Sequence, residues 1–92
     1  MDEKKIRTAV DRFIQKPHWR AYYEEAPSDA CKRHIALEFY YSDNLGEIAD
    51  YDEYRSEREK LQSKFTREDW THLYKYAGSN PWKAYCRKQM ES

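Results

Sequence analysis

The residues of this sequence that could bind a metal ion are Cys31, His34, His72 and Cys86. Cys31 and His34 have the spacing of half a zinc site, but the other two would have to join them in space to complete a tetrahedral set of ligands. The simpler interpretation is two core thiols and two ordinary histidines, since free cysteine is among the most buried residue types. We therefore expect no metal and no other cofactor, and we keep a zinc-stabilised fold as the third hypothesis.

The sequence contains no motif of a known catalytic site. It has no glycine-rich phosphate loop, no Gly-x-Ser-x-Gly and no His-Glu-x-x-His. Cys31 lies near an expected helix start beside Lys32 and Arg33, which could lower the pKa of its thiol, but no base is adjacent to it in the sequence. Paired acids such as Glu24 and Glu25 fit solvated helix faces and first turns. We expect no catalytic residues and a protein that is not an enzyme.

Residues 66–90 have the outline of a helix-turn-helix, with two helical segments joined by a tight turn that contains Gly78. The residues of the second helix that could reach a DNA groove or phosphates are Asn80, Lys83, Arg87 and Lys88. Tyr74 argues against this motif, because close helix crossing usually requires a small residue at that position. DNA binding is therefore the alternative function and is not favoured.

Aromatic rings make up an unusual share of the apolar residues. The 92-residue chain has nine Tyr, three Trp and three Phe, whereas Leu, Ile, Val and Phe together number only twelve. A buried ring removes roughly 150–250 Å² from water, so rings can replace the missing aliphatic bulk. Because the net charge is zero, this composition favours a folded domain with an aromatic core over disorder.

A chain of this size seldom buries every large ring, and the rings left outside form an adhesive patch. Tyr, Trp and Arg are also the residue types enriched at interface hot spots. We therefore expect a non-catalytic protein-binding module, such as an adaptor, an assembly subunit or an inhibitor, that docks onto another protein or onto itself. The residues expected to bind the partner are Tyr23, Tyr40, Tyr54, Arg58 and Tyr76, all of them except Tyr54 expected to be exposed.

Arg58 is the most informative of these residues, because it interrupts an apolar stripe formed by Tyr51, Tyr54, Leu61 and Phe65. Its stem could pack against the stripe while its charged head reaches water. Its guanidinium could instead stack on Tyr54. The third possibility is that this face is only partly buried and that Arg58 anchors a partner.

The net charge of zero, from 17 basic and 17 acidic residues, gives no overall attraction to nucleic acid or to a membrane surface. No apolar run reaches the roughly 18 residues of a membrane span, and the first residues do not resemble a secretory signal. We expect a cytoplasmic protein, no membrane contact and no disulfide. An acidic stretch over residues 43–53 is followed by a more basic one, a pattern typical of solvated helix faces that could also steer a charged partner.

The spacing of apolar residues predicts helices joined by short breaks. A stripe over residues 6–14 indicates the first helix, and Pro17 suits the first turn of the next. The segment over residues 30–41 contains a run, residues 35–41, that is apolar nearly all round, which predicts a central helix, although residues 39–41 favour a strand locally. We expect a single domain over residues 1–92, an all-α compact bundle of about five short helices.

Several residues indicate where these helices begin and end. Capping boxes are expected at Asp50 with Glu53 and at Thr66 with Asp69. Ser28 and Asn80 are expected N-caps, and Gly78 is expected to end a helix in the left-handed conformation. Phe65 and Trp70 have the spacing of a hydrophobic staple around Thr66.

Overall fold

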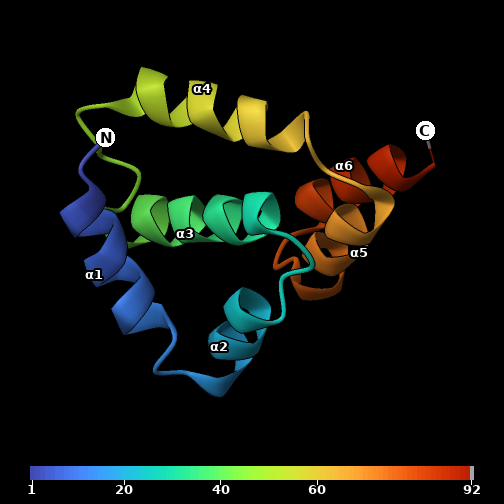
Figure 1. The fold of residues 1–92 in the computed structure, drawn as a ribbon, viewed down its shortest axis with the longest axis horizontal. Coiled ribbons are helices and arrows are strands. Elements are labelled where there is room, and N and C mark those ends of the chain that lie inside the picture. Colours follow the sequence, from blue (N-terminus) through green and yellow to red (C-terminus); the bar gives the residue numbers. More distant parts are fainter. Residues whose placement is uncertain (92) are drawn as a thin grey trace.

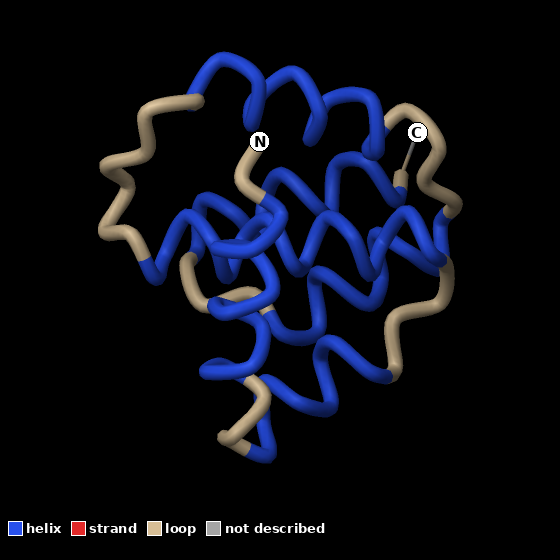
Figure 2. The backbone as a smooth tube through the Cα atoms, turned by 60° about the vertical axis from the view of Figure 1, so that its left-hand side comes forward, coloured by secondary structure: helices blue, strands red, loops and turns tan. Residues whose placement is uncertain are grey.

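The computed structural model describes residues 1–91 and contains only helices and loops over that range (Figures 1 and 2). Its helices are α1 (Glu3–Phe13), α2 (Pro17–Glu24), α3 (Asp29–Asp43), α4 (Tyr51–Gln62), α5 (Arg67–Tyr76) and α6 (Asn80–Met90). The expected all-α bundle is confirmed, with six helices rather than about five. The count is six because every break in the sequence separates two helices, including the one before Thr66.

Helix α3 is the centre of the bundle and packs against α1, α2 and α4, while α5 packs against α2 and α6. Figure 1 shows α3 in the middle, with α4 running antiparallel along one side and α1 and α2 on the other. Ile35 and Leu37 on α3 are completely buried. Residues 39–41 are helical, since burial on all sides within a bundle overrides their local preference for a strand.

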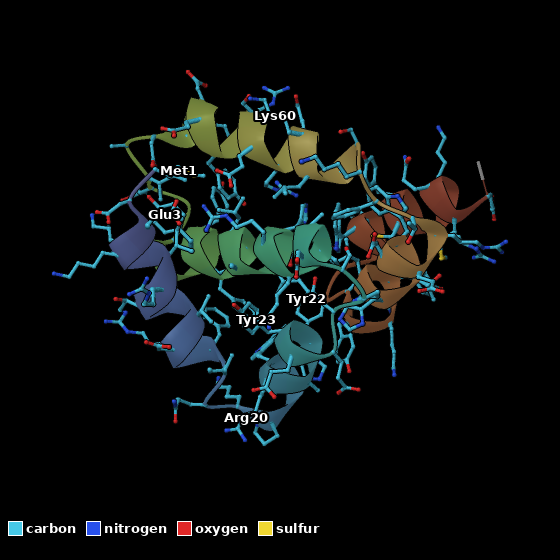
Figure 3. All side chains as sticks on the ribbon, viewed as in Figure 1. Met1, Glu3, Arg20, Tyr22, Tyr23 and Lys60 are labelled. Carbon is cyan, nitrogen blue, oxygen red and sulfur yellow. The ribbon has the colours of Figure 1, made fainter. Side chains whose placement is uncertain are left out.

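The core between α1, α2 and α3 is built from rings. Phe13 stacks on Phe39 with ring centroids 4.5 Å apart, and Trp19 meets Phe39 edge to face. Tyr22 lies between Trp19 and Tyr76 at centroid distances of 5.9 and 5.0 Å. Figure 3 shows Tyr22 and Tyr23 between α2 and α3. The expected replacement of aliphatic bulk by aromatic rings is therefore confirmed.

A single buried carboxylate joins the beginnings of α3 and α5. Asp69, whose side chain is 1% exposed, accepts a hydrogen bond from the Thr66 backbone N–H at 2.8 Å, and Thr66 caps α5 in return. The other oxygen of Asp69 accepts from the Ser28 hydroxyl at 2.8 Å. Ser28 in turn accepts from the backbone N–H of Cys31 and caps α3. The second capping box, the Ser28 cap and the contact of Phe65 with Trp70 are as expected.

The expected capping box of Asp50 and Glu53 is wrong, because both side chains make contacts outside α4. The Asp50 carboxylate accepts from the Tyr40 hydroxyl at 2.9 Å and makes no cap hydrogen bond. Glu53 accepts from the amino group of Met1 at 2.7 Å. These contacts tie α4 to the central helix and to the chain start.

The turn between α5 and α6 also differs from expectation. Ser79, not Asn80, is the N-cap of α6, and its hydroxyl accepts from the Trp82 backbone N–H. Gly78 is not left-handed, because Ala77 already leaves the helix in an extended conformation with φ −60° and ψ 132°. Positive φ angles occur instead at Leu45 and Gly46, after α3.

Arg33 on α3 holds two further helices together. Its two terminal nitrogens donate to Glu3 on α1 at 2.8 and 2.7 Å, and its Nε donates to Glu57 on α4 at 2.9 Å. These hydrogen bonds hold the pKa of Glu3 below its usual value. A planar guanidinium with several donors is suited to such a three-helix contact, whereas a lysine ammonium is not.

We predict that Asp69→Ala lowers the free energy of unfolding by about 2–4 kcal/mol, because it leaves the Thr66 backbone N–H and the Ser28 hydroxyl without their buried acceptor. Urea unfolding followed by circular dichroism measures the change. Glu68→Ala is the matched control: this neighbouring acid is exposed, and its loss should cost at most about 0.5 kcal/mol. Equal effects of the two substitutions would contradict the linking role of Asp69.

Candidate functional site

The five residues expected to bind a partner do not lie at one site in the structure. Tyr54 and Arg58 line one groove. Tyr40 was expected to be exposed, and this is wrong: it is 3% exposed, because α4 covers it and Asp50 accepts its hydroxyl. Tyr23 is half-buried beside Lys32 in a separate depression between α1 and α3, and Tyr76 is half-buried in the ring cluster of α2 and α5.

We call the groove of Tyr54 and Arg58 the α3–α4–α6 groove, after the helices that form its walls. It encloses about 550 Å³, which is within the usual range for ligand sites. Most of its lining is aromatic or polar. The lining residues are Glu38, Tyr41, Ser42, Tyr51, Tyr54, Arg58, Gly78, Ser79 and Trp82.

Two pairs of stacked rings form opposite parts of this site. Tyr41 and Tyr54 stack at 5.1 Å with an interplanar angle of 10°, and Tyr51 leans on both of them. Trp82 stacks on Tyr85 at 5.4 Å. Tyr51 and Tyr85 are 44% and 42% exposed, whereas Tyr54 is buried and Trp82 is half-buried.

Arg58 connects the two ring stacks. Its guanidinium carbon lies 5.5 Å from the centroid of Tyr54 and 5.9 Å from that of Trp82. Its Nε donates to Nε2 of His34 at 3.4 Å. The expected stacking on Tyr54 is therefore present, and Arg58, which is half-buried, contacts three side chains. Cation–π contacts of this kind strengthen as the cation loses water.

A line of polar side chains lies beneath the groove. The Tyr22 hydroxyl donates to Oε2 of Glu38 at 2.8 Å, and Oε1 of Glu38 lies 3.0 Å from Nδ1 of His34. Gln62 meets Nε2 of the same ring at 3.0 Å. His34 is completely buried and its Nε2 accepts from Arg58, whereas Nδ1 of His34 and Oε1 of Glu38 make no hydrogen bond within residues 1–91.

Burial and hydrogen bonding raise the proton affinity of the tyrosines around this line. Burial, together with the Glu38 carboxylate, holds the pKa of Tyr22 far above its ordinary value. Burial raises the pKa of Tyr54 to about 12, although the Arg58 cation opposes the rise. Both hydroxyls therefore stay protonated and remain hydrogen-bond donors at neutral pH.

The four candidate metal ligands do not assemble. His34 is engaged by Arg58 and Gln62, while His72 contacts the backbone oxygen of Tyr22 at 2.7 Å. Cys31 and Cys86 are free, buried thiols. Across residues 1–91, no group of three or more His, Cys, Asp or Glu side chains is arranged to hold a metal ion.

The expectation that Lys32 and Arg33 lower the pKa of Cys31 is wrong. Burial raises the pKa of the Cys31 thiol to about 12, and the nearby carboxylates of Asp69 and Glu38 add to the rise. Burial likewise raises the pKa of Cys86 to about 12. A thiol is a nucleophile only as the thiolate, so neither cysteine is activated.

The four residues considered for DNA binding do lie on one face. Together with Tyr74, Ala84 and Glu91 they line a depression of about 350 Å³ on the α5–α6 hairpin; they are Asn80, Lys83, Arg87 and Lys88. Arg87 also lies 3.8 Å from the Glu91 carboxylate. This face is separate from the α3–α4–α6 groove, since no residue lines both.

The acidic stretch over residues 43–53 is used mainly inside the molecule. Asp43 pairs with Arg12 at 3.0 Å, and the carboxylates of Asp50 and Glu53 accept from Tyr40 and Met1. The other two acids of the stretch, Glu47 and Asp52, are exposed. Steering of a charged partner by this stretch therefore has little support.

Sequence reasoning missed Glu38, Tyr41 and Trp82 as members of the site. Glu38 carried a usable signal, because it is the one charged residue in the apolar run 35–41, and a charge in a buried helix must find partners. Trp82 carried no such signal, since its spacing on α6 is that of an ordinary core residue.

Comparisons of this chain with protein-family models, with curated proteins and with solved structures find no match. Among residues 1–91, none of the helices has an apolar stretch long enough to span a bilayer. The site must therefore be interpreted from its own geometry and chemistry.

We predict that both thiols of the folded protein resist Ellman's reagent at about pH 8, because their raised pKa values leave only roughly one thiol in ten thousand ionised. Absorbance of the released thiolate measures the reaction. Addition of guanidinium should make both cysteines react within minutes. Rapid modification of one thiol before denaturation would contradict the burial of that cysteine.

Proposed function

We propose that this chain is a non-catalytic protein-binding module and that the α3–α4–α6 groove is its docking surface. The observation that carries the proposal is the placement of Arg58 between the Tyr54 and Trp82 rings at the edge of an open groove. Tyr, Trp and Arg in a partly desolvated pocket are the residue types that dominate binding energy at protein interfaces.

The exposed rings at the edge of the site support this proposal. Tyr51 and Tyr85 keep close to half of their surface in water, although Tyr51 leans on the buried Tyr54 ring and Tyr85 meets the buried Trp70 ring edge to face. A ring already fixed in one rotamer loses little entropy on binding. Such side chains are suited to contact with a partner.

The chemistry of the site fits binding better than catalysis. Both thiols are buried and protonated, and His34 is completely enclosed. Within the described part of the chain, no nucleophile lies beside a general base in an open cavity, which is the arrangement that covalent catalysis requires. Two free cysteines also fit a reducing compartment, and we propose a cytoplasmic location.

We predict that benzoylphenylalanine placed at Tyr51 crosslinks the partner on irradiation in extract of the native host. Mass spectrometry identifies the captured protein or a second copy of this chain. Arg58→Ala in the same protein should reduce the crosslink at least fivefold, because it removes the side chain that connects the two ring stacks. Benzoylphenylalanine at Lys16, an exposed position in the α1–α2 loop, is the matched control.

Crosslinking of the same proteins from both positions, or no effect of Arg58→Ala, would contradict docking through the groove. Sedimentation velocity of the purified protein at micromolar concentration then shows whether the captured species is a dimer. Far-UV circular dichroism establishes that the Arg58→Ala protein is folded.

DNA binding remains the second candidate, and the shared depression of Asn80, Lys83, Arg87 and Lys88 favours it. Basic residues on one helix beside the Tyr74 ring could follow a phosphate backbone. The zero net charge of the chain opposes this function, because sequence-independent binding depends on neutralising many phosphates.

If this second function holds, the triple substitution Lys83→Ala, Arg87→Ala and Lys88→Ala should weaken DNA binding for every sequence tested. The slope of log affinity against log salt should also fall by roughly 0.9 for each phosphate that the variant no longer neutralises. Fluorescence anisotropy with a labelled duplex measures both. The matched control is Lys60→Ala with Lys64→Ala, which removes exposed charges from the α4 region. Unchanged affinity in the triple variant would exclude this face as the DNA site.

A further inference from the structure

We propose that Arg58 is the receptor for a single carboxylate, supplied by an Asp or Glu side chain of an acidic peptide segment that enters the α3–α4–α6 groove. This inference rests on the proposed docking function and specifies its chemistry. Its basis is the juxtaposition of an incompletely bonded guanidinium, several unused hydroxyl donors and aromatic walls in one groove.

The orientation of Arg58 leaves its terminal nitrogens available. Nε donates to the buried His34 ring, and the guanidinium carbon lies over the two flanking rings. Among residues 1–91, no acceptor bonds to Nη1 or Nη2 of this side chain, in contrast to Arg33, whose terminal nitrogens both donate to Glu3. A pair of parallel N–H donors in one plane is the geometry that binds a carboxylate through both oxygens.

Other residues that line the groove also carry hydrogen-bond donors with no acceptor in the described part of the chain. Tyr51, Tyr54 and Ser42 line it, and their hydroxyls donate to no acceptor within residues 1–91. Burial raises the pKa of Tyr54 to about 12, so its hydroxyl keeps its proton. A carboxylate has about four lone-pair sites, which Arg58 and these hydroxyls together could satisfy.

The charge of the groove favours a monoanion. Among the described residues that line it, Arg58 is the one cation and Glu38 is the one anion. Glu38 is already engaged by Tyr22 and faces His34, but it still repels a second negative charge. Phosphate groups are usually bound by clusters of arginine, and no such cluster lines this groove. A single carboxylate therefore fits better than a phosphoryl group.

The ring walls indicate the neighbours of that acid in the partner. Tyr41, Tyr54 and Trp82 provide apolar surface on both sides of Arg58, and aromatic pairs contribute beyond their buried area. An acidic residue flanked by aromatic side chains would fill the groove and pair its cation at the same time. A purely acidic segment would leave the rings without a partner.

The test uses the ¹⁵N-labelled full chain and two peptides, acetyl-Phe-Asp-Phe-amide and acetyl-Phe-Asn-Phe-amide, which differ only in the charge of the central residue. NMR follows the side-chain N–H signals of Arg58 and Trp82, with Trp19 and Trp70 as internal references. We expect the Asp peptide to shift the Arg58 and Trp82 signals to saturation and to bind at least fivefold more tightly than the Asn peptide.

Arg58→Lys keeps the charge but loses the forked pair of donors, and we expect it to reduce the preference for Asp at least twofold. Arg55→Lys is the matched control, since Arg55 lies on the same helix but is exposed and paired with Glu59; the preference should be unchanged. Equal affinity for the two peptides, shifts spread over all basic residues, or tighter binding of acetyl-Phe-phosphoserine-Phe-amide would overturn the proposal.

The outcome is separable from the test of docking itself. A partner captured from Tyr51 with no preference for the Asp peptide would overturn the carboxylate receptor and leave the docking surface intact. Specific binding of the Asp peptide with no captured partner would support the receptor and count against the protein-binding function.

Discussion

Glu38 introduces a carboxylate into the central helix of an aromatic core, and much of the arrangement around it follows from the need to pair that charge. The Glu38 side chain keeps 24% of its surface in water, and its buried part requires polar partners. Tyr22 from α2 donates to one oxygen, and His34 from α3 faces the other. His34 is in turn held by Arg58 and Gln62 of α4. The carboxylate thus joins α2 to α3 through one hydrogen bond, and His34 beside it joins α3 to α4 through Arg58 and Gln62.

Aromatic rings and charged groups contribute differently to the packing of this small domain. Stacked and edge-on rings fill the interior between α1, α2 and α3, where only a few aliphatic side chains are available. Charged groups join helices at defined points, as Asp69 does for the starts of α3 and α5 and Arg33 does for α1, α3 and α4. Hydrophobic burial is not directional, so these polar contacts supply the specificity of the packing.

The candidate site is an extension of the same core. Tyr54 and Trp82 are packed on one side against buried residues and on the other face the groove. The rings that stabilise the bundle and the rings offered to a partner are therefore continuous. This explains why Arg58 can stand in an apolar stripe, since its neighbours provide stacking surfaces as well as bulk.

The sequence determined the helical class, the aromatic core and the cap of α5, because helical spacing, ring content and the Thr66–Asp69 pair act locally or through composition. It also indicated Tyr54 and Arg58, since a charge within an apolar stripe is visible without coordinates. Only the tertiary structure decided that Asp50 bonds Tyr40 rather than capping α4, that Tyr40 is buried, and that Glu38 and Trp82 join the groove. These outcomes depend on which helices meet in space, and pairings between distant segments leave no periodic signal in the chain.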